Sequence, residues 1–294
     1  MRKIRPRPPL SISCASCSPA RRRPPPWGRG GPGRGAVVLE RLNFLWRLVV
    51  TGIAFAVIFA GGALMALTVF PLIGLFTPPG PARRDRSQRF IHHAFGFYVR
   101  MLHTLGLLHL EVVGASKLRD PGGRLIVANH PTLLDVVLLM ALVPRAQCIV
   151  KKELWDSPYL GRVVRGAGYI RNDLEPEALL EACRAVLDEG NSLIVFPEGT
   201  RTTPGEAVRF RRGFANIATL LEVEIQLVTI TCRPPTLIKG EKWWMIPPHR
   251  PRFKVDIGQR LDAKGWFGYE YRSLAARKLV RQIEEYYTEQ LANG

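Results

Sequence analysis

Cysteine and acidic residues are scarce in this 294-residue chain, and these shortages bear on the disulfides, metal sites and partners that the protein can have. Five cysteines are too few for a disulfide framework, and the one CxxC pair, Cys14 and Cys17, lacks the second pair that a zinc site needs. The other three, Cys148, Cys183 and Cys232, fall in apolar runs and fit reduced core thiols. Only 24 Asp and Glu oppose 42 Lys and Arg, so the net charge of +18 indicates an anionic partner: a membrane surface, a nucleic acid or a phosphorylated substrate.

The start of the chain is rich in Arg, Pro and Gly. Residues 1–36, with RRRPPP at 21–26, cannot bury enough apolar surface to fold, so we predict a disordered basic tail. An arm for anionic lipid or nucleic acid is the functional alternative. Aromatic interleaving is confined to Trp27, and much of the remaining positive charge flanks an apolar segment. Anionic lipid explains that placement, and no nucleic-acid partner is expected.

Residues 48–76 carry no charged side chain, which is enough length to cross a bilayer core. Gly61-Gly62 lies near the middle of this segment. Basic residues flank both ends: Arg41 and Arg47 before it, and Arg83, Arg84, Arg86 and Arg89 after it. The positive-inside bias draws both flanks to the cytoplasmic side, which a re-entrant helical hairpin satisfies and a single span does not. Both arrangements stay open, and residues 37–80 are predicted to form a membrane anchor.

Residues 81–294 are predicted to form one α/β domain. Short apolar runs at 125–128, 148–150, 193–196, 227–231 and 253–257 are typical of buried strands. Helical spacing is found at 88–109, 132–142 and 271–292, and a helix opened by Pro176 and closed by Gly190 lies between two strands. Strands that alternate with helices indicate an α/β fold, in which sites form at strand–turn–helix junctions.

The first such junction reads Val-Ala-Asn-His-Pro-Thr-Leu-Leu-Asp over residues 127–135. His130 lies just past a strand, Pro131 suits a first helical position, and Asp135 lies about one turn further on. A carboxylate there can orient the imidazole and stabilise the imidazolium, leaving the other ring nitrogen as a general base. Such a pair can also arise by accident, and the junction position is what favours a catalytic role.

The second junction reads Leu-Ile-Val-Phe-Pro-Glu-Gly-Thr-Arg over residues 193–201. Gly199 permits close backbone approach, and Arg201 suits bidentate phosphate binding. An ordinary turn with a surface ion pair, formed by Glu198, is the alternative.

Together, Asn129-His130-x-x-x-x-Asp135 and Phe196-Pro197-Glu198-Gly199-Thr200-Arg201 resemble the motifs of the glycerolipid acyltransferase family, which includes 1-acylglycerol-3-phosphate acyltransferases. Lys151, in a Lys-Lys-Glu-Leu run, also resembles that family. The resemblance implies that His130 deprotonates an acceptor hydroxyl, with Asp135 orienting it, and that the hydroxyl attacks an acyl thioester of coenzyme A or acyl carrier protein. It further implies that residues 198–201 hold the acceptor phosphate.

Two blocks depart from the family pattern. Residues 166–173 read Gly-Ala-Gly-Tyr-Ile-Arg-Asn-Asp, which shifts the arginine to Arg171, and residues 227–230 lack the usual proline. Arg171 and Arg212 are candidate ligands of the same phosphate. The departures leave the chemistry intact and leave the acceptor open.

No G-x-S-x-G sequence occurs, so direct attack is favoured over an acyl-enzyme. No metal or cofactor is expected beyond the thioester co-substrate. We expect an O-acyltransferase of phospholipid biosynthesis at the membrane, on the cytoplasmic face of the inner membrane if the source is bacterial. The alternatives are an acyltransferase of a specialised lipid, of the ornithine-lipid or aryl-polyene type, and a catalytically idle lipid-binding protein.

Overall fold

The computed structural model describes residues 34–119, 122–158, 160–203, 205–262 and 272–293. Two compact units divide the chain at Arg41, and everything below concerns the larger one, Leu42–Gly294. The predicted tail, residues 1–36, lies outside the described residues as far as residue 33.

A seven-stranded sheet forms the centre of this unit, in the order β1-β7-β6-β2-β5-β3-β4. Its strands are β1 (His109–Val113), β2 (Leu125–Ala128), β3 (Ala146–Val150), β4 (Ile170–Arg171), β5 (Ser192–Val195), β6 (Ile225–Arg233) and β7 (Arg252–Leu261). All neighbouring strands run parallel except β6 and β7. The predicted α/β class is confirmed, and the five predicted strands are all present.

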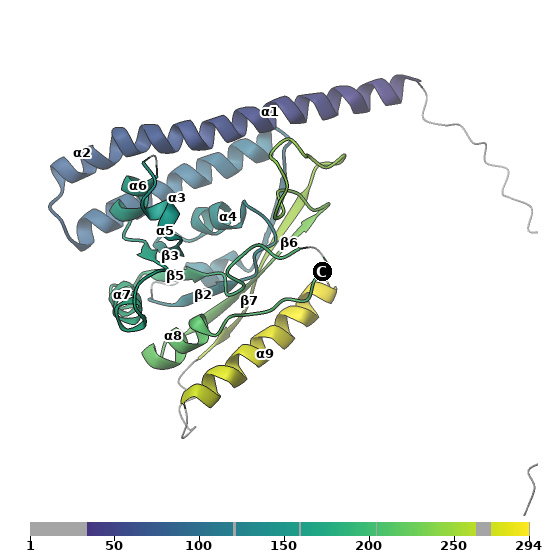
Figure 1. The fold of residues 1–294 in the computed structure, drawn as a ribbon. Coiled ribbons are helices and arrows are strands. Elements are labelled where there is room, and N and C mark those ends of the chain that lie inside the picture. The colour runs from purple at the N-terminus through teal and green to yellow at the C-terminus, as the bar shows by residue number, and fades with distance from the viewer. Residues whose placement is uncertain (1–33, 120–121, 159, 204, 263–271, 294) are drawn as a thin grey trace, which may run out of the picture. The chain divides into compact units, whose positions relative to one another are not determined.

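Helices cover both faces of the sheet (Figure 1). On one face lie α3 (Pro81–Thr104), α4 (Asp135–Leu142), α5 (Lys152–Trp155) and α6 (Gly161–Gly166); on the other lie α7 (Pro176–Asp188), α8 (Gly213–Leu221) and α9 (Arg272–Asn293); a short 3-10 turn, η1 (Ala115–Leu118), follows β1. Side chains alternate along β2 accordingly: Ile126 and Ala128 pack into the first core, Leu125 and Val127 into the second.

The apolar segment forms α1 (Arg34–Leu67) and α2 (Val69–Phe76). The helix is continuous through Gly61-Gly62, so the re-entrant hairpin considered for residues 48–76 does not turn there. The chain reverses at residues 77–80, and α3 begins at Pro81. The α3 side of this hairpin packs against α1, with the Tyr98 hydroxyl donating to Ala54 O at 3.1 Å.

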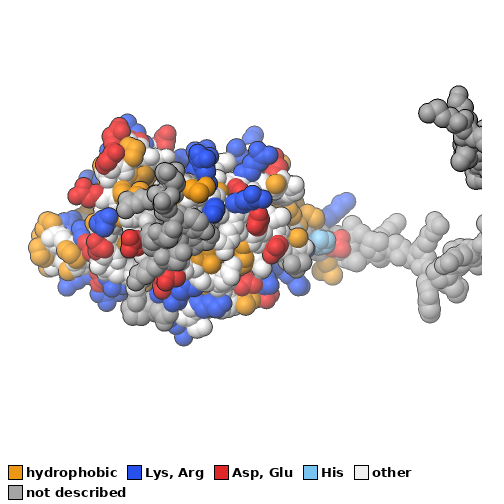
Figure 2. All heavy atoms as spheres, turned by 90° about the horizontal axis from the view of Figure 1, so that it is seen from below, with side chains coloured by type: hydrophobic (Ala, Val, Ile, Leu, Met, Phe, Trp, Pro, Cys, Tyr) orange, Lys and Arg blue, Asp and Glu red, His pale blue; other side chains and the backbone are white. Residues whose placement is uncertain are grey.

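Most of the apolar surface of α1 and α2 has no partner in the unit. The helix Val38–Phe76 is long and apolar enough to cross a membrane, and 22% of its most apolar window is buried. Exposed side chains include Phe59, Leu67, Leu75 and Phe76, the last 74% exposed. The face seen in Figure 2 instead carries interspersed charges of both signs around smaller apolar areas. This contrast makes α1 and α2 the candidate membrane anchor.

Candidate active site

The parallel pairing of β2 with β5 brings the two predicted junctions to one edge of the sheet. Val127 is in register with Val195, so residues 129–135 and 196–201 leave the sheet side by side. Asn129 holds the first turn to β6, because its side chain donates to Ile230 O and accepts from Ile230 N at 2.8 and 2.7 Å. The predicted juxtaposition of the two motifs is therefore present.

His130 and Asp135 form the predicted pair. His130 Nδ1 lies 2.8 Å from Asp135 Oδ2, with the His130 side chain 17% exposed and the Asp135 side chain fully buried. Burial raises the pKa of Asp135, and hydrogen bonds from His130 and Thr132 oppose that effect. The opposite edge of the imidazole is left for a substrate, while Phe196 packs on the ring at a centroid distance of 4.4 Å.

Thr132 explains why the helix starts later than predicted. Its backbone N–H and its hydroxyl both donate to the Asp135 carboxylate, at 2.7 and 2.6 Å. Asp135 thus bonds the turn that precedes it, and α4 begins at residue 135 rather than 132. The carboxylate is fixed by three donors before any substrate binds, which holds the imidazole in one orientation.

Glu198, on the second junction, contacts the first junction. Its Oε1 accepts the His130 backbone N–H at 2.9 Å, and its side chain is 7% exposed. Burial, the largest cause, raises the pKa of Glu198 to about 7. A buried acid that bonds the His130 backbone joins the two junctions to each other, and a carboxylate is a poor partner for phosphate. Glu198 therefore positions the His130 backbone, and its predicted role as a phosphate ligand stays a prediction.

A polar pocket opens at this turn, and three predicted residues line it: Glu198, Thr200 and Arg201. The rest of its lining is Thr202, Thr203, Glu206, Ala207, Arg209 and Lys239. Arg201 Nη1 donates to Leu237 O and Ile238 O at 2.9 and 3.1 Å, so part of its guanidinium is already committed to the protein. Arg209 and Lys239 were not predicted as site residues, because neither belongs to the two motifs.

Gly199 lies in the left-handed region, at φ 70°, and a Cβ there would lie 3.0 Å from Arg211 Nε. Arg211 is thus the arginine beside this turn, whereas Arg212 is exposed at the start of α8. Arg171 is paired with Asp173 through Nε and Nη2, at 2.8 and 2.6 Å. Lys151 is exposed at the end of β3. Neither Lys151, Arg171 nor Arg212 lines the polar pocket.

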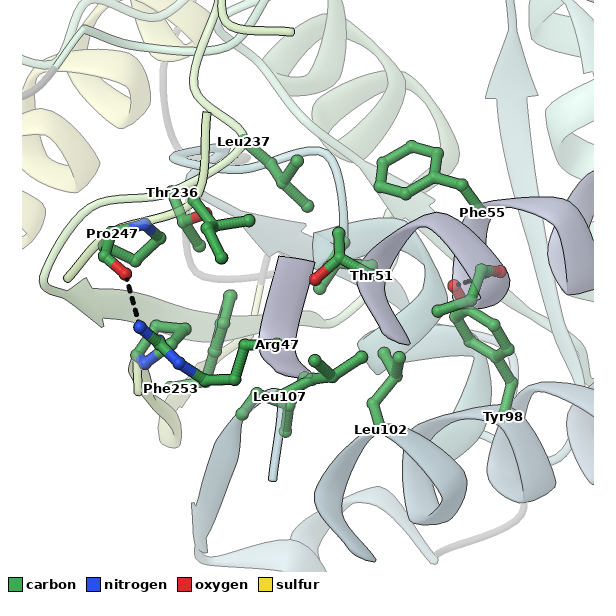
Figure 3. A pocket seen from close by; sticks show the side chains of 15 residues that line it. Arg47, Thr51, Phe55, Tyr98, Leu102, Leu107, Thr236, Leu237, Pro247 and Phe253 are labelled. Carbon is green, nitrogen blue, oxygen red and sulfur yellow. Dashed lines mark hydrogen bonds between the residues drawn. The ribbon is translucent and has the colours of Figure 1, made fainter. Parts of the chain in front are cut away.

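The loop between β6 and β7 closes the other side of the site. Leu237 O accepts both the Leu133 N–H, at 3.1 Å, and Arg201 Nη1, so this loop touches both junctions. Figure 3 shows how the loop meets α1: the buried Arg47 side chain reaches Pro247. Arg47 Nη2 donates to Pro247 O and Pro248 O at 2.9 and 2.5 Å. The apolar helix is thereby connected to the active-site turn through one loop.

Two more features of the described residues limit the chemistry. They contain no group of three or more His, Cys, Asp or Glu side chains placed to hold a metal ion. Burial raises the pKa of Cys148, Cys183 and Cys232 to about 12, which keeps these thiols protonated and poorly nucleophilic. The imidazole of His130 stays the candidate for proton transfer at this site.

A His–Asp pair at a strand–helix junction of a mainly parallel sheet, near a polar pocket with three basic side chains, is the arrangement expected of a general-base site. Residues 109–233 match the family described as Acyltransferase. The resemblance to acyltransferases inferred from the two motifs is confirmed over this segment, which contains both junctions.

Relatives and a solved structure agree with this match. A 1-acyl-sn-glycerol-3-phosphate acyltransferase of Helicobacter pylori is 39% identical over 125 residues, covering 40% of this chain and 52% of that protein. One from Cocos nucifera is 31% identical over 169 residues, covering 55% and 53%. The chain thus spans about half the length of the curated relatives it matches. The crystal structure of the 1-acyl-sn-glycerophosphate acyltransferase PlsC of Thermotoga maritima shares the fold, with a TM-score of 0.62 at 22% identity over 85% of this chain and 98% of that one.

Proposed function

We propose that this protein is an O-acyltransferase that moves a fatty acyl group from a thioester to the hydroxyl of a lysophospholipid, foremost 1-acylglycerol-3-phosphate, giving phosphatidic acid. The observation that carries the proposal is the 2.8 Å contact between His130 Nδ1 and the buried Asp135. The motif match and the names of the relatives support the same reaction.

In the proposed reaction His130 Nε2 accepts the proton of the acceptor hydroxyl. The hydroxyl oxygen bonds to the thioester carbonyl carbon, the carbon–sulfur bond breaks, and the proton passes to the departing thiolate. Asp135 stabilises the imidazolium that forms between these events. No acyl-enzyme is needed, and the donor can be acyl-coenzyme A or an acyl carrier protein.

The acceptor phosphate is proposed to bind in the polar pocket, to the free edge of Arg201 and to Lys239 and Arg209. An acyl chain is proposed to lie in an apolar pocket that begins at Leu133 and Leu134 and extends between α1 and α6 to Leu160 and Val163. One pocket is polar and the other is apolar, which suits a substrate pair with one charged and one apolar end. Membrane lipids are then the partners, and the site faces the cytoplasm in the proposed arrangement.

The test is mass spectrometry of the lipids made by the purified full-length protein. It is offered lysophosphatidic acid, other lysophospholipids, and ornithine-lipid or aryl-polyene precursors, each with both thioester donors. We expect phosphatidic acid as the main product, strongly reduced with Asp135→Asn. A product from a specialised acceptor only would replace the proposed substrate, and no acylated product with any pair would support an idle lipid-binding protein.

A further inference from the structure

A second basic pocket lies away from the site described above, at the end of the apolar helix. It is lined by four arginines, Arg83, Arg84, Arg162 and Arg165, and by Ser87, with Phe70 and Pro71 of α2 at its edge. It shares no residue with the polar pocket beside Glu198. No acidic side chain lines it, so it is strongly positive.

Two of the arginines are already used by the protein. Arg84 pairs with Glu189, and Arg165 Nη1 donates to Trp155 O at 2.6 Å. Within the described part of the chain, Arg83 and Arg162 have neither an ion pair nor a hydrogen bond. A side chain at Gly74 would collide with the Arg83 guanidinium, so the glycine makes room for this arginine beside α2. Two guanidinium groups are thus free to bind the same ligand.

Ser87 independently indicates a ligand. It is 1% exposed, it lines this pocket, and its buried hydroxyl has no hydrogen-bond partner among the described residues. An unpaired buried hydroxyl is unfavourable, and a bound acceptor oxygen would remove this cost. The first turn of α3 adds to this, because the 24-residue helix begins at Pro81 with no side-chain cap and points its N-terminal N–H groups outward.

We propose that this pocket binds the phosphate of an anionic phospholipid. Guanidinium groups and a helix N-terminus favour phosphate oxygens, and the hydroxyl supplies one more donor. The neighbouring α2 side chains Leu72, Leu75 and Phe76 are 53%, 75% and 74% exposed, so apolar surface suited to acyl tails adjoins the arginines. A phosphate that carries acyl chains fits both features, whereas free phosphate uses only the first.

The experiment uses the full-length protein in nonionic detergent micelles, with lipid binding measured by native mass spectrometry. The main probe is phosphatidylglycerol, which is neither substrate nor product of the proposed reaction; phosphatidylcholine and inorganic phosphate are the comparison probes. Arg83→Gln combined with Arg162→Gln removes the two free cations. Arg184→Gln combined with Arg277→Gln, at exposed positions on α7 and α9, removes the same charge elsewhere.

We expect phosphatidylglycerol to bind at least about tenfold more weakly to the Arg83/Arg162 variant and unchanged to the Arg184/Arg277 variant. Ser87→Val should weaken binding without lowering the melting temperature of the ligand-free protein. If inorganic phosphate instead binds as well as phosphatidylglycerol and depends on the same two arginines, that result would overturn the lipid as the ligand and indicate a soluble phosphate compound. Equal weakening in both double variants, or none in either, would overturn the site. His130→Ala should bind the probe normally, so a failure of the proposed reaction is distinguishable.

Discussion

At the level of single residues, the His130–Asp135 pair depends on donors from its own turn. Thr132 holds both carboxylate oxygens, and Glu198 holds the His130 backbone, so the imidazole is fixed from two directions. The pair itself was predictable from spacing after a strand. The role of Glu198 was not, because its partner is a backbone N–H from the other motif and leaves no trace in the sequence.

Arg201 gives the first prediction at this scale. Arg201→Lys keeps the charge but loses the planar fork, so it should raise the Michaelis constant for the acceptor about tenfold or more and leave donor binding unchanged. Because Arg201 also bonds Leu237 O and Ile238 O, Lys239→Gln is the companion variant that spares those contacts. Steady-state kinetics on both should show a rise. If the Michaelis constant for the acceptor rises with Arg201→Lys alone, Arg201 holds the loop and does not bind the phosphate.

Glu198 gives a prediction about pH. Its pKa is about 7 in the folded protein against 4.5 for the free side chain, so the folded state binds the proton more tightly. The free energy of unfolding therefore falls as pH rises from about 4.5 to 7, by at most about 3 kcal/mol. Glutamine does not titrate, so the free energy of unfolding of Glu198→Gln does not fall for this reason. Wild type should therefore become less stable relative to the variant as pH rises from 5 to 8. A constant difference in denaturant unfolding would show that Glu198 ionises normally.

At the level of elements, most strands and helices followed from apolar periodicity. The strand at 125–128 and the helix between Pro176 and Gly190 were recovered because their patterns and end signals are local. The hairpin considered within the apolar segment was wrong: α1 runs through Gly61 and Gly62 without a break, since a glycine inside a helix costs only about 1 kcal/mol relative to alanine. The loop of residues 234–251 was missed because its place in the site depends on contacts with Leu133, Arg201 and Arg47.

Arg47 gives the prediction for this loop. Arg47→Gln should lose the contacts to Pro247 O and Pro248 O, loosening the loop by about 1.5–3 kcal/mol. Trypsin should then cut faster after Lys239 and Lys242, and acyl transfer should fall because Leu237 supports both junctions. Arg100→Gln, at an exposed position on α3, is the control. Unchanged proteolysis in Arg47→Gln would show that the Arg47 contacts do not hold this loop in place.

At the level of the whole molecule, the apolar helix and the basic charge both fit a protein that is attached to an anionic lipid bilayer. Exposed apolar side chains on α1 and α2, a net charge of +18 and two arginine-lined pockets fit a protein held against anionic lipid. The charge was evident from composition. Which basic residues line the two pockets was not evident, because they come from separate helices and loops.

Membrane attachment is the prediction at this scale. Because residues 48–76 carry no charge, the full-length protein should stay in the pellet when membranes are extracted with alkaline carbonate. A version with Asp at the exposed positions Ile53, Phe59 and Leu64 should shift to the supernatant while its domain stays folded. Release of the unaltered chain would mean that the helix lies on the protein rather than in the bilayer.

The central claim is that His130, oriented by Asp135, is the base for acyl transfer, and acceptor-dependent thioester consumption tests it most directly. His130→Ala should lose about 10²–10⁴-fold in rate while circular dichroism shows the fold intact, since the residue lies in a turn at the sheet edge. Asp135→Asn should also lose most of the rate, and the double variant should be little worse than either, because the pair acts as a unit. If His130→Ala keeps more than about a tenth of the wild-type rate, His130 is not the base.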